Sequence, residues 1–186
     1  MIGFAMCGSF CSFEKSVNTL EKLIEEGYDV LPIMSGISYS TDTRFGSCSL
    51  WRERVETLCG HSILHTIPDT EPLGPKIALD ALVICPCTGN TLSKLALGMT
   101  DTSVCMAAKA HLRCDRPLLI ALASNDAMSA NLGNIATLLK RKNIYFVPMI
   151  QDDPVSKPHS LVADFSLVPS CLRDAIDGRQ ARPLFL

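Results

Sequence analysis

The sequence lacks a long apolar run, because none of its 186 residues belongs to an uninterrupted apolar stretch of about 18 or more. A helix needs about 20 predominantly apolar residues to cross a bilayer, so we expect no membrane span. The first residues, Met1 to Met6, also lack the basic start and apolar core of a signal peptide. They have the pattern of a first strand, and we expect a cytoplasmic protein.

An excess of positive charge is missing as well. The chain has 17 Lys and Arg residues against 19 Asp and Glu residues, for a formal net charge of −2. Proteins that bind nucleic acid neutralise phosphates with a basic surface, so we expect no nucleic-acid partner. Hydrophobic residues make up 47% and charged residues 19% of the chain, which is typical of a globular protein. This length is sufficient for one domain with a substantial core.

Two kinds of motif are also absent. The sequence contains neither a GxGxxG motif nor a P-loop, so we expect no Rossmann-type dinucleotide site within the chain itself. It has nine cysteines but no pair of CxxC elements. Their odd number and scattered spacing are typical of reduced, buried thiols, and we expect no metal site.

Apolar runs and helical patterns alternate along the chain. Strands are predicted over residues 2–6, 29–34, 62–67, 82–85, 118–122 and 144–149. Helices are predicted over residues 13–26, 50–59, 90–98, 102–113, 131–142 and 170–177. Strands that alternate with helices pair in parallel, with helices on both faces. The sequence therefore predicts an α/β fold: a single three-layer α/β/α domain over residues 1–186 with a Rossmann-like or flavodoxin-like parallel sheet, and residues 150–186 as a peripheral segment.

Small polar residues follow four of the predicted strands. They lie in the segments 7–12, 34–36, 85–91 and 121–126. In an open α/β sheet, ligands bind outside the carboxyl ends of the strands, where helix N-termini also lie. The segment Cys85–Thr91 is the richest, because Gly89 permits close approach and its neighbours supply hydrogen-bonding groups. Each segment alone is compatible with a tight turn or a helix cap, but four on one sheet edge favour a ligand site.

These segments resemble a flavoprotein family that includes peptide cysteine decarboxylases, phosphopantothenoylcysteine decarboxylase and flavin prenyltransferases. Pro86–Thr91 is similar to the Pro-Ala-Ser-Ala-Asn-Thr stretch of that family, and Lys94, Ala96, Gly98 and Asp101 match the positions that follow it. The resemblance spans about residues 1–150 and implies FMN as cofactor. It implies these cofactor contacts: Gly8, Ser9, Phe10, Ser35, Pro86, Thr88, Asn90, Thr91, Ser124 and Asn125.

Within this family, nearly the whole chain resembles one subfamily, the dipicolinate synthase B subunits of spore-forming bacteria. The resemblance rests on segments such as 40–46, 71–76, 106–110 and 142–148. It implies oxidation of a dihydrodipicolinate-type precursor during sporulation, beside a dipicolinate synthase A subunit that binds NADP. The hydride acceptor is then FMN on this chain or NADP on the partner. Four cations are candidate contacts for the dicarboxylate substrate, with solvated or salt-bridged side chains as the alternative: Arg44, Lys76, Lys94 and Lys109.

Two departures from the family pattern bear on the chemistry. The decarboxylase histidine position falls at Pro72, and the prenyltransferase arginine position falls at Met106. These departures count against an FMN-binding decarboxylase or prenyltransferase, which stays an alternative to an oxidoreductase subunit. A non-catalytic partner subunit is the other alternative. Asp101, Asp126 and His65 are candidate bases, and the sequence assigns the catalytic role to none of them. The family resemblance also implies a homo-oligomer, a trimer or a multiple of one, with the site at the boundary between two protomers.

Overall fold

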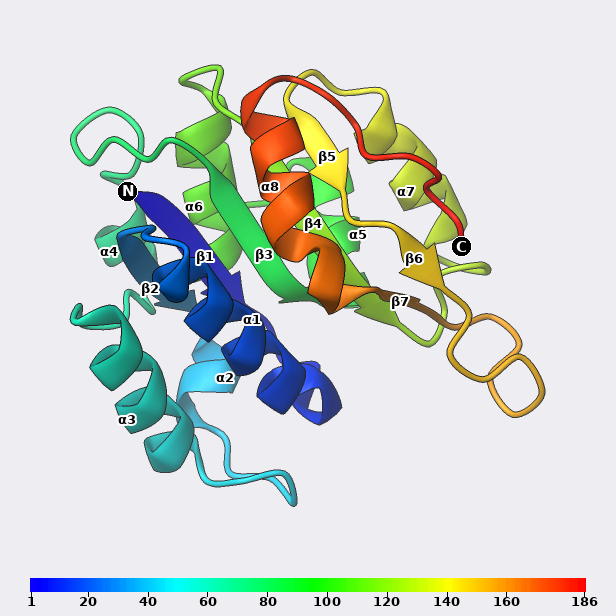
Figure 1. The fold of residues 1–186 in the computed structure, drawn as a ribbon, viewed down its shortest axis with the longest axis horizontal. Helices are drawn as coiled ribbons and strands as arrows, with labels where there is room; N and C mark the ends of the chain where they lie inside the picture. Colours follow the sequence, from blue (N-terminus) through cyan, green and yellow to red (C-terminus); the bar gives the residue numbers. More distant parts are fainter.

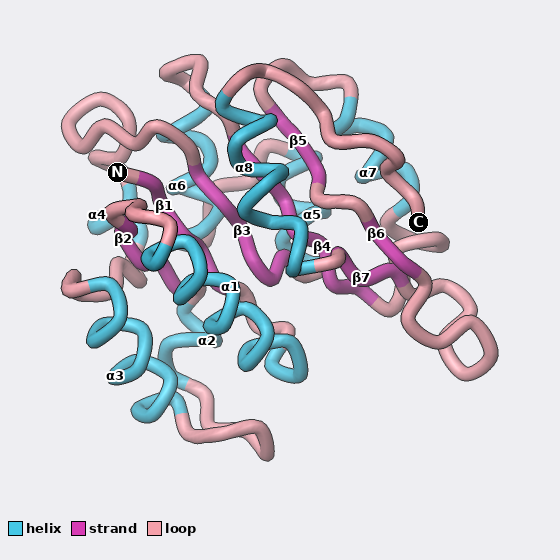
Figure 2. Tube along the Cα trace, in the orientation of Figure 1, coloured by secondary structure: helices cyan, strands magenta, loops and turns pink.

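The computed structural model describes residues 1–186 as a seven-stranded sheet with helices on both faces (Figure 1, Figure 2). The strands are β1 (Ile2–Met6), β2 (Val30–Met34), β3 (Leu82–Cys87), β4 (Leu118–Ser124), β5 (Ile144–Phe146), β6 (Met149–Ile150) and β7 (Leu161–Ala163). The helices are α1 (Phe13–Glu25), α2 (Gly36–Ser40), α3 (Cys48–Cys59), α4 (Ile67–Thr70), α5 (Gly89–Leu97), α6 (Ser103–Leu112), α7 (Leu132–Leu139) and α8 (Val168–Ile176). The predicted three-layer α/β fold is confirmed. No helix combines the length and the apolar character that crossing a membrane requires.

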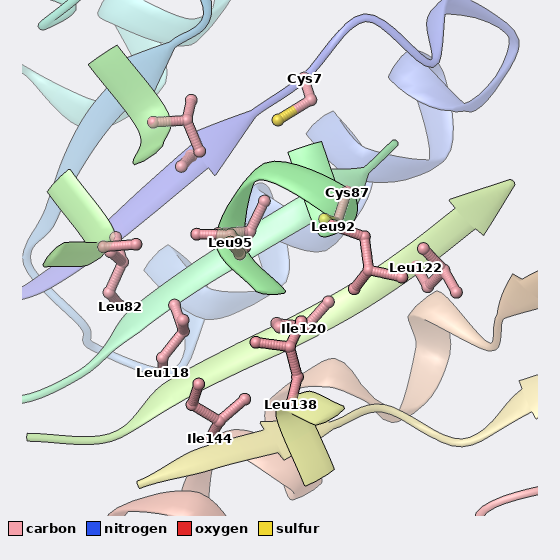
Figure 3. Packing of buried hydrophobic residues seen from close by; sticks show 14 of the residues in the cluster. Cys7, Leu82, Cys87, Leu92, Leu95, Leu118, Ile120, Leu122, Leu138 and Ile144 are labelled. Atoms are coloured by element: carbon pink, nitrogen blue, oxygen red, sulfur yellow. The ribbon is translucent and has the colours of Figure 1, made fainter. Parts of the chain in front are cut away.

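The centre of the sheet is parallel, in the order β2, β1, β3 and β4, and β5 also pairs with β4. Every residue of β1, β2 and β3 is buried, because helices cover both faces of these strands. One core lies beneath α5, α6 and α7, where Leu92 and Leu95 face Ile120 and Leu122 of β4 (Figure 3). The second core lies on the opposite face, beneath α1, α3 and α8.

The predicted parallel sheet forms the centre of the molecule, and an antiparallel edge makes the whole sheet mixed. β7 pairs antiparallel with both β4 and β6. The predicted strand over 144–149 is divided into β5 and β6 around Pro148, which has no N–H to donate to a sheet. The irregular segment 151–160 then connects β6 to the three-residue β7, a strand too short to show a period in the sequence.

The prediction of a strand over residues 62–67 is wrong. Only Leu64 pairs with the sheet, through an isolated bridge to Ile33 of β2. Thr66 and Asp69 then form a capping box in which each side chain accepts a hydrogen bond from the backbone of the other residue. This box starts α4 and ends the extended segment, which the apolar pattern alone does not reveal.

The C-terminal part of the chain contributes to the core, so the expectation that residues 150–186 are peripheral does not hold for α8. Val168 and Leu172 of this helix are fully buried and belong to the core beneath α1. The final residues pair with β6 through a bridge between Met149 and Phe185. α8 therefore completes one face of the sheet.

Two glycines with the same backbone conformation allow a matched test of the packing between the 71–80 loop and α6. Gly27 has φ +90° and open space where a Cβ would lie, whereas a Cβ on Gly74 (φ +89°) would lie 2.4 Å from the backbone oxygen of Ala110. We expect Gly27→Ala to cost about 1–2 kcal/mol from the left-handed conformation alone. Gly74→Ala should cost about 1–3 kcal/mol more, because the backbone of α6 must move. Urea unfolding measures both, and equal losses would contradict this close packing.

Candidate functional site

A cavity of about 530 Å³ lies at the carboxyl edge of the parallel strands, and we call it the edge cavity. Its walls come from the segments after β1, β2 and β3, from the segment around α4, and from the start of α6. The lining residues are Cys7, Gly8, Ser35, Gly36, Ile37, His65, Ile67, Thr88, Asn90, Thr91, Asp101, Thr102 and Ser103. Parallel pairing brings these segments together although up to 96 residues separate them (from Cys7 to Ser103).

Two helix N-termini form part of the edge cavity. Thr88 caps α5, where its Oγ1 accepts a hydrogen bond from the N–H of Thr91 (3.2 Å). Thr102 caps α6 in the same way, accepting from the N–H of Cys105 (3.2 Å). The other N–H groups of each first turn have no intrahelical acceptor, and the helix dipoles make this region favourable for an anion.

The start of α6 is fixed to the sheet by a buried hydrogen bond. Ser103 Oγ donates to the backbone oxygen of Met34, the last residue of β2, at 2.7 Å. The hydroxyl of Ser35, the next residue, accepts from the N–H of Ser38 and lies 2.8 Å from its Oγ. The loop after β2 and the start of α6 are therefore held in one arrangement beside the cavity.

The first turn of α5 is supported from behind by a polar cluster. Asp126 accepts hydrogen bonds from the hydroxyl of Ser124 and from Nδ2 of Asn131 (2.9 Å). Ser93 of α5 donates to Oδ1 of Asn131 (2.8 Å). A Cβ at Gly89 would lie 2.5–2.8 Å from Ser124, Asp126 and Asn131, so only glycine lets the helix approach this cluster so closely.

The thiol of Cys7 faces the cavity without the properties of a nucleophile. Burial raises the pKa of the Cys7 thiol to about 12, and the Thr91 hydroxyl donates a hydrogen bond to its Sγ (3.3 Å). Since the thiolate is the reactive form, a thiol with this pKa is inert near neutral pH. Cys7 therefore contributes packing and a fixed contact to the loop after β3.

The structure brings together five of the ten predicted cofactor contacts in the edge cavity: Gly8, Ser35, Thr88, Asn90 and Thr91. The other five do not line it. Ser9 Oγ lies 3.3 Å from Ser12 Oγ, and the Phe10 ring packs on Phe13. Pro86 is buried within β3, and Ser124 and Asn125 lie at the end of β4 outside the cavity.

The four predicted substrate cations do not gather at the site. Lys94 is the nearest to it, paired with Asp101 at 2.7 Å, and this hydrogen bond lowers the pKa of the Asp101 carboxyl. Arg44 is exposed over the ring of Phe45. Lys76 lies before β3, at the opposite edge of the sheet, and Lys109 lines a separate groove between α5 and α6. The edge cavity therefore has no free lysine or arginine among its lining residues.

Sequence reasoning missed several lining residues, among them Ile37, Ile67, Thr102 and Ser103. Thr102, the first residue of the predicted helix at 102–113, is a cap signal that could have located the α6 start. Of the three candidate bases, His65 and Asp101 line the cavity, whereas Asp126 lies outside it in the cluster behind α5. Pro72, the position reached by counting back from Pro86, belongs to the loop at the opposite edge.

Comparison with known proteins identifies the family of this chain. The family model described as Flavoprotein matches residues 1–165. The B subunit of dipicolinate synthase from Bacillus subtilis (strain 168) is 43% identical over 185 residues, covering 100% of this chain and 92% of that protein. The crystal structure of the B subunit of dipicolinate synthase from Bacillus halodurans C has a TM-score of 0.91 at 39% identity, over 100% of this chain and 95% of that chain.

A more distant structure shares the fold alone. The FMN-dependent cysteine decarboxylase SpaF has a TM-score of 0.70 at 22% identity, over 94% of this chain and 95% of that chain. The family match covers far more than half of the sequence, and the full-length relatives exceed 30% identity. The chain therefore belongs to the flavoprotein family, and within that family it is similar over its whole length to the B subunit of dipicolinate synthase.

Proposed function

We propose that this chain is the B subunit of a dipicolinate synthase and that its edge cavity is a ligand site of that enzyme. The observation that carries the proposal is full-length similarity to the B subunit of dipicolinate synthase, at 43% identity. In this assignment an A subunit supplies NADP as the terminal oxidant, and a dihydrodipicolinate-type dicarboxylate is oxidised to dipicolinate. The cytoplasm of a sporulating cell is the compartment that this role implies.

The residues of the edge cavity are suited to FMN. A volume of about 530 Å³ lies within the range of about 300–1,000 Å³ typical of cofactor sites. N–H groups at the starts of α5 and α6 would hold the phosphate. Hydroxyl and amide groups of Ser35, Thr88 and Asn90 would hold the ribityl chain, and Ile37 offers apolar surface to the ring. When bound, the flavin would supply a two-electron relay between substrate and nicotinamide.

The charge pattern of the cavity supports an anionic ligand rather than a cationic one. Asp101 is the one acidic residue of the lining, and Lys94 neutralises it at 2.7 Å. Cys7 stays a neutral thiol. What remains is the positive potential of two helix N-termini, which attracts phosphates and carboxylates alike. A family decarboxylase or prenyltransferase is less well supported, because Pro72 and Met106 both lie outside the lining.

FMN binding tests the cofactor assignment. Wild-type protein should quench the fluorescence of added FMN with saturation. Asn90→Ala should weaken FMN binding about five- to tenfold, because one side-chain hydrogen bond contributes about 1 kcal/mol. Asn125→Ala is the matched control, since Asn125 is exposed and outside the cavity, and should bind like wild type. Absence of saturable binding in all three proteins would overturn the FMN assignment.

Reconstitution tests the proposed place of this chain in the synthase. We expect dipicolinate to form from the dihydropyridine precursor and NADP only when this chain and an A subunit are mixed. Ultraviolet absorbance of the aromatic product measures the rate. Asn90→Ala should lower the rate of the mixture and Asn125→Ala should not, because only Asn90 lines the cavity.

Two outcomes would count against this assignment. An A subunit that reaches the full rate alone would exclude a role for this chain in the reaction. A mixture that requires this chain but tolerates Asn90→Ala at the full rate would instead indicate a non-catalytic partner.

A further inference from the structure

A stack of three side chains from separate segments supports one wall of the edge cavity from behind. The rings of Tyr39 and His65 are parallel, with centroids 3.6 Å apart and an interplanar angle of 4°. The guanidinium of Arg52 lies over the Tyr39 ring, 4.5 Å from its centroid. Tyr39 belongs to α2 and Arg52 to α3, two helices that lie next to each other in Figure 1. Only His65 of the three lines the cavity.

The surroundings distinguish the two ring nitrogens of His65. Nδ1 lies 3.4 Å from the backbone oxygen of Ile63 and 3.9 Å from Oδ2 of Asp69. Hydrogen bonds from Thr66 hold the Asp69 carboxylate and lower its pKa, so it stays charged beside the ring. Two acceptors near Nδ1 favour the tautomer with the proton on that atom. Nε2 then has a free lone pair, and no protein group hydrogen-bonds it.

We propose that His65 is the proton acceptor of the edge cavity and that Tyr39 and Arg52 are positioning residues that set the orientation of its ring. This inference rests on the proposed function and names the base of that site. It also explains the stack: face-to-face contact on one side and polar contacts at Nδ1 fix the plane and the rotation of the imidazole. A base held in this way is ready to accept a proton without further rearrangement.

The proton and electron balance of the reaction gives His65 its task. A dihydropyridine dicarboxylate becomes aromatic when it loses one C–H bond as hydride and one further proton from the ring. The hydride electron pair ends on the nicotinamide of the A subunit, which is thereby reduced. The proton forms an N–H bond at Nε2 of His65, and the electron pair that it leaves completes the aromatic ring. The resulting imidazolium returns the proton to water.

Several ionisable groups face this imidazole. Asp69 on α4 stabilises the imidazolium after proton transfer, and the ion pair of Asp101 with Lys94 lies in the same cavity. Arg52 is separated from His65 by the Tyr39 ring. A general base accepts a proton only in its neutral form, so turnover of the wild-type enzyme should rise from acidic toward neutral pH.

His65→Gln tests the acceptor role, with His61→Gln as the matched control. His61 is close in the sequence but outside the cavity, with Nε2 2.9 Å from Oδ1 of Asp29. In the reconstituted enzyme His65→Gln should lower turnover at least about 100-fold and remove the rising limb of the pH profile. His61→Gln should keep both. A His65→Gln enzyme with the wild-type profile would overturn the proposal.

Tyr39 tests the positioning role. Tyr39→Phe keeps the ring that stacks on His65 and should retain wild-type turnover. Tyr39→Leu removes the ring and should lower turnover about tenfold or more while leaving the KM for the substrate unchanged, because a displaced base slows proton transfer. Equal turnover in the two variants would exclude a positioning role for the stack.

The outcomes separate this inference from the proposed function. If wild-type mixtures form no dipicolinate, the proposed function fails, and imidazole NMR titration with added dipicolinate then tests His65 without turnover. The His65 resonances should shift on ligand addition and those of His61 should not. Shifts at neither histidine would show that His65 does not contact the ligand and would overturn the inference as well.

Discussion

Parallel pairing of β2, β1 and β3 is the constraint on which the site depends. A parallel sheet places all its strand ends at one edge, so loops distant in sequence share one space. The same arrangement directs the starts of α5 and α6 toward that edge, since each helix runs antiparallel to the strands. The hydrogen bond from Ser103 to the backbone of Met34 then fixes α6 against β2. The topology of the sheet therefore creates the edge cavity, whichever side chains line it.

The lining side chains carry no unpaired charge, so the helix dipoles determine the electrostatic potential at this edge. Lys94 neutralises Asp101, and burial keeps Cys7 protonated, so no free negative charge remains in the lining. Arg44 and Lys76, two cations that could attract an anion, lie outside the lining of the cavity. Backbone N–H groups therefore provide the attraction for an anion, and they do so with fixed geometry and no side-chain entropy to lose.

The sequence is sufficient to predict the parts of this molecule that depend on local patterns. Apolar runs locate β1 to β4, and the segment Cys85–Thr91 identifies a loop that lines the cavity. The sequence is not sufficient where a tertiary contact determines whether an element forms. β7 has only three residues, and its strand conformation depends on antiparallel pairing with β4 and β6. The lining residues Ile37 and Ile67 carry no signal, because nothing local indicates which exposed apolar side chains face a cavity.

The position of His65 shows why counting along a motif fails at this site. Counting back from Pro86 assumes a loop of constant length before β3, and it reaches Pro72 at the wrong edge of the sheet. In this chain the bridge between Leu64 and Ile33 ends at the carboxyl edge, so the next residue enters the cavity whatever the length of the loop that follows. Strand pairing, rather than distance along the sequence, places the imidazole of His65 in the same cavity as the segment Cys85–Thr91. A histidine is therefore available to the site even though no histidine occupies the position at which the family pattern has one.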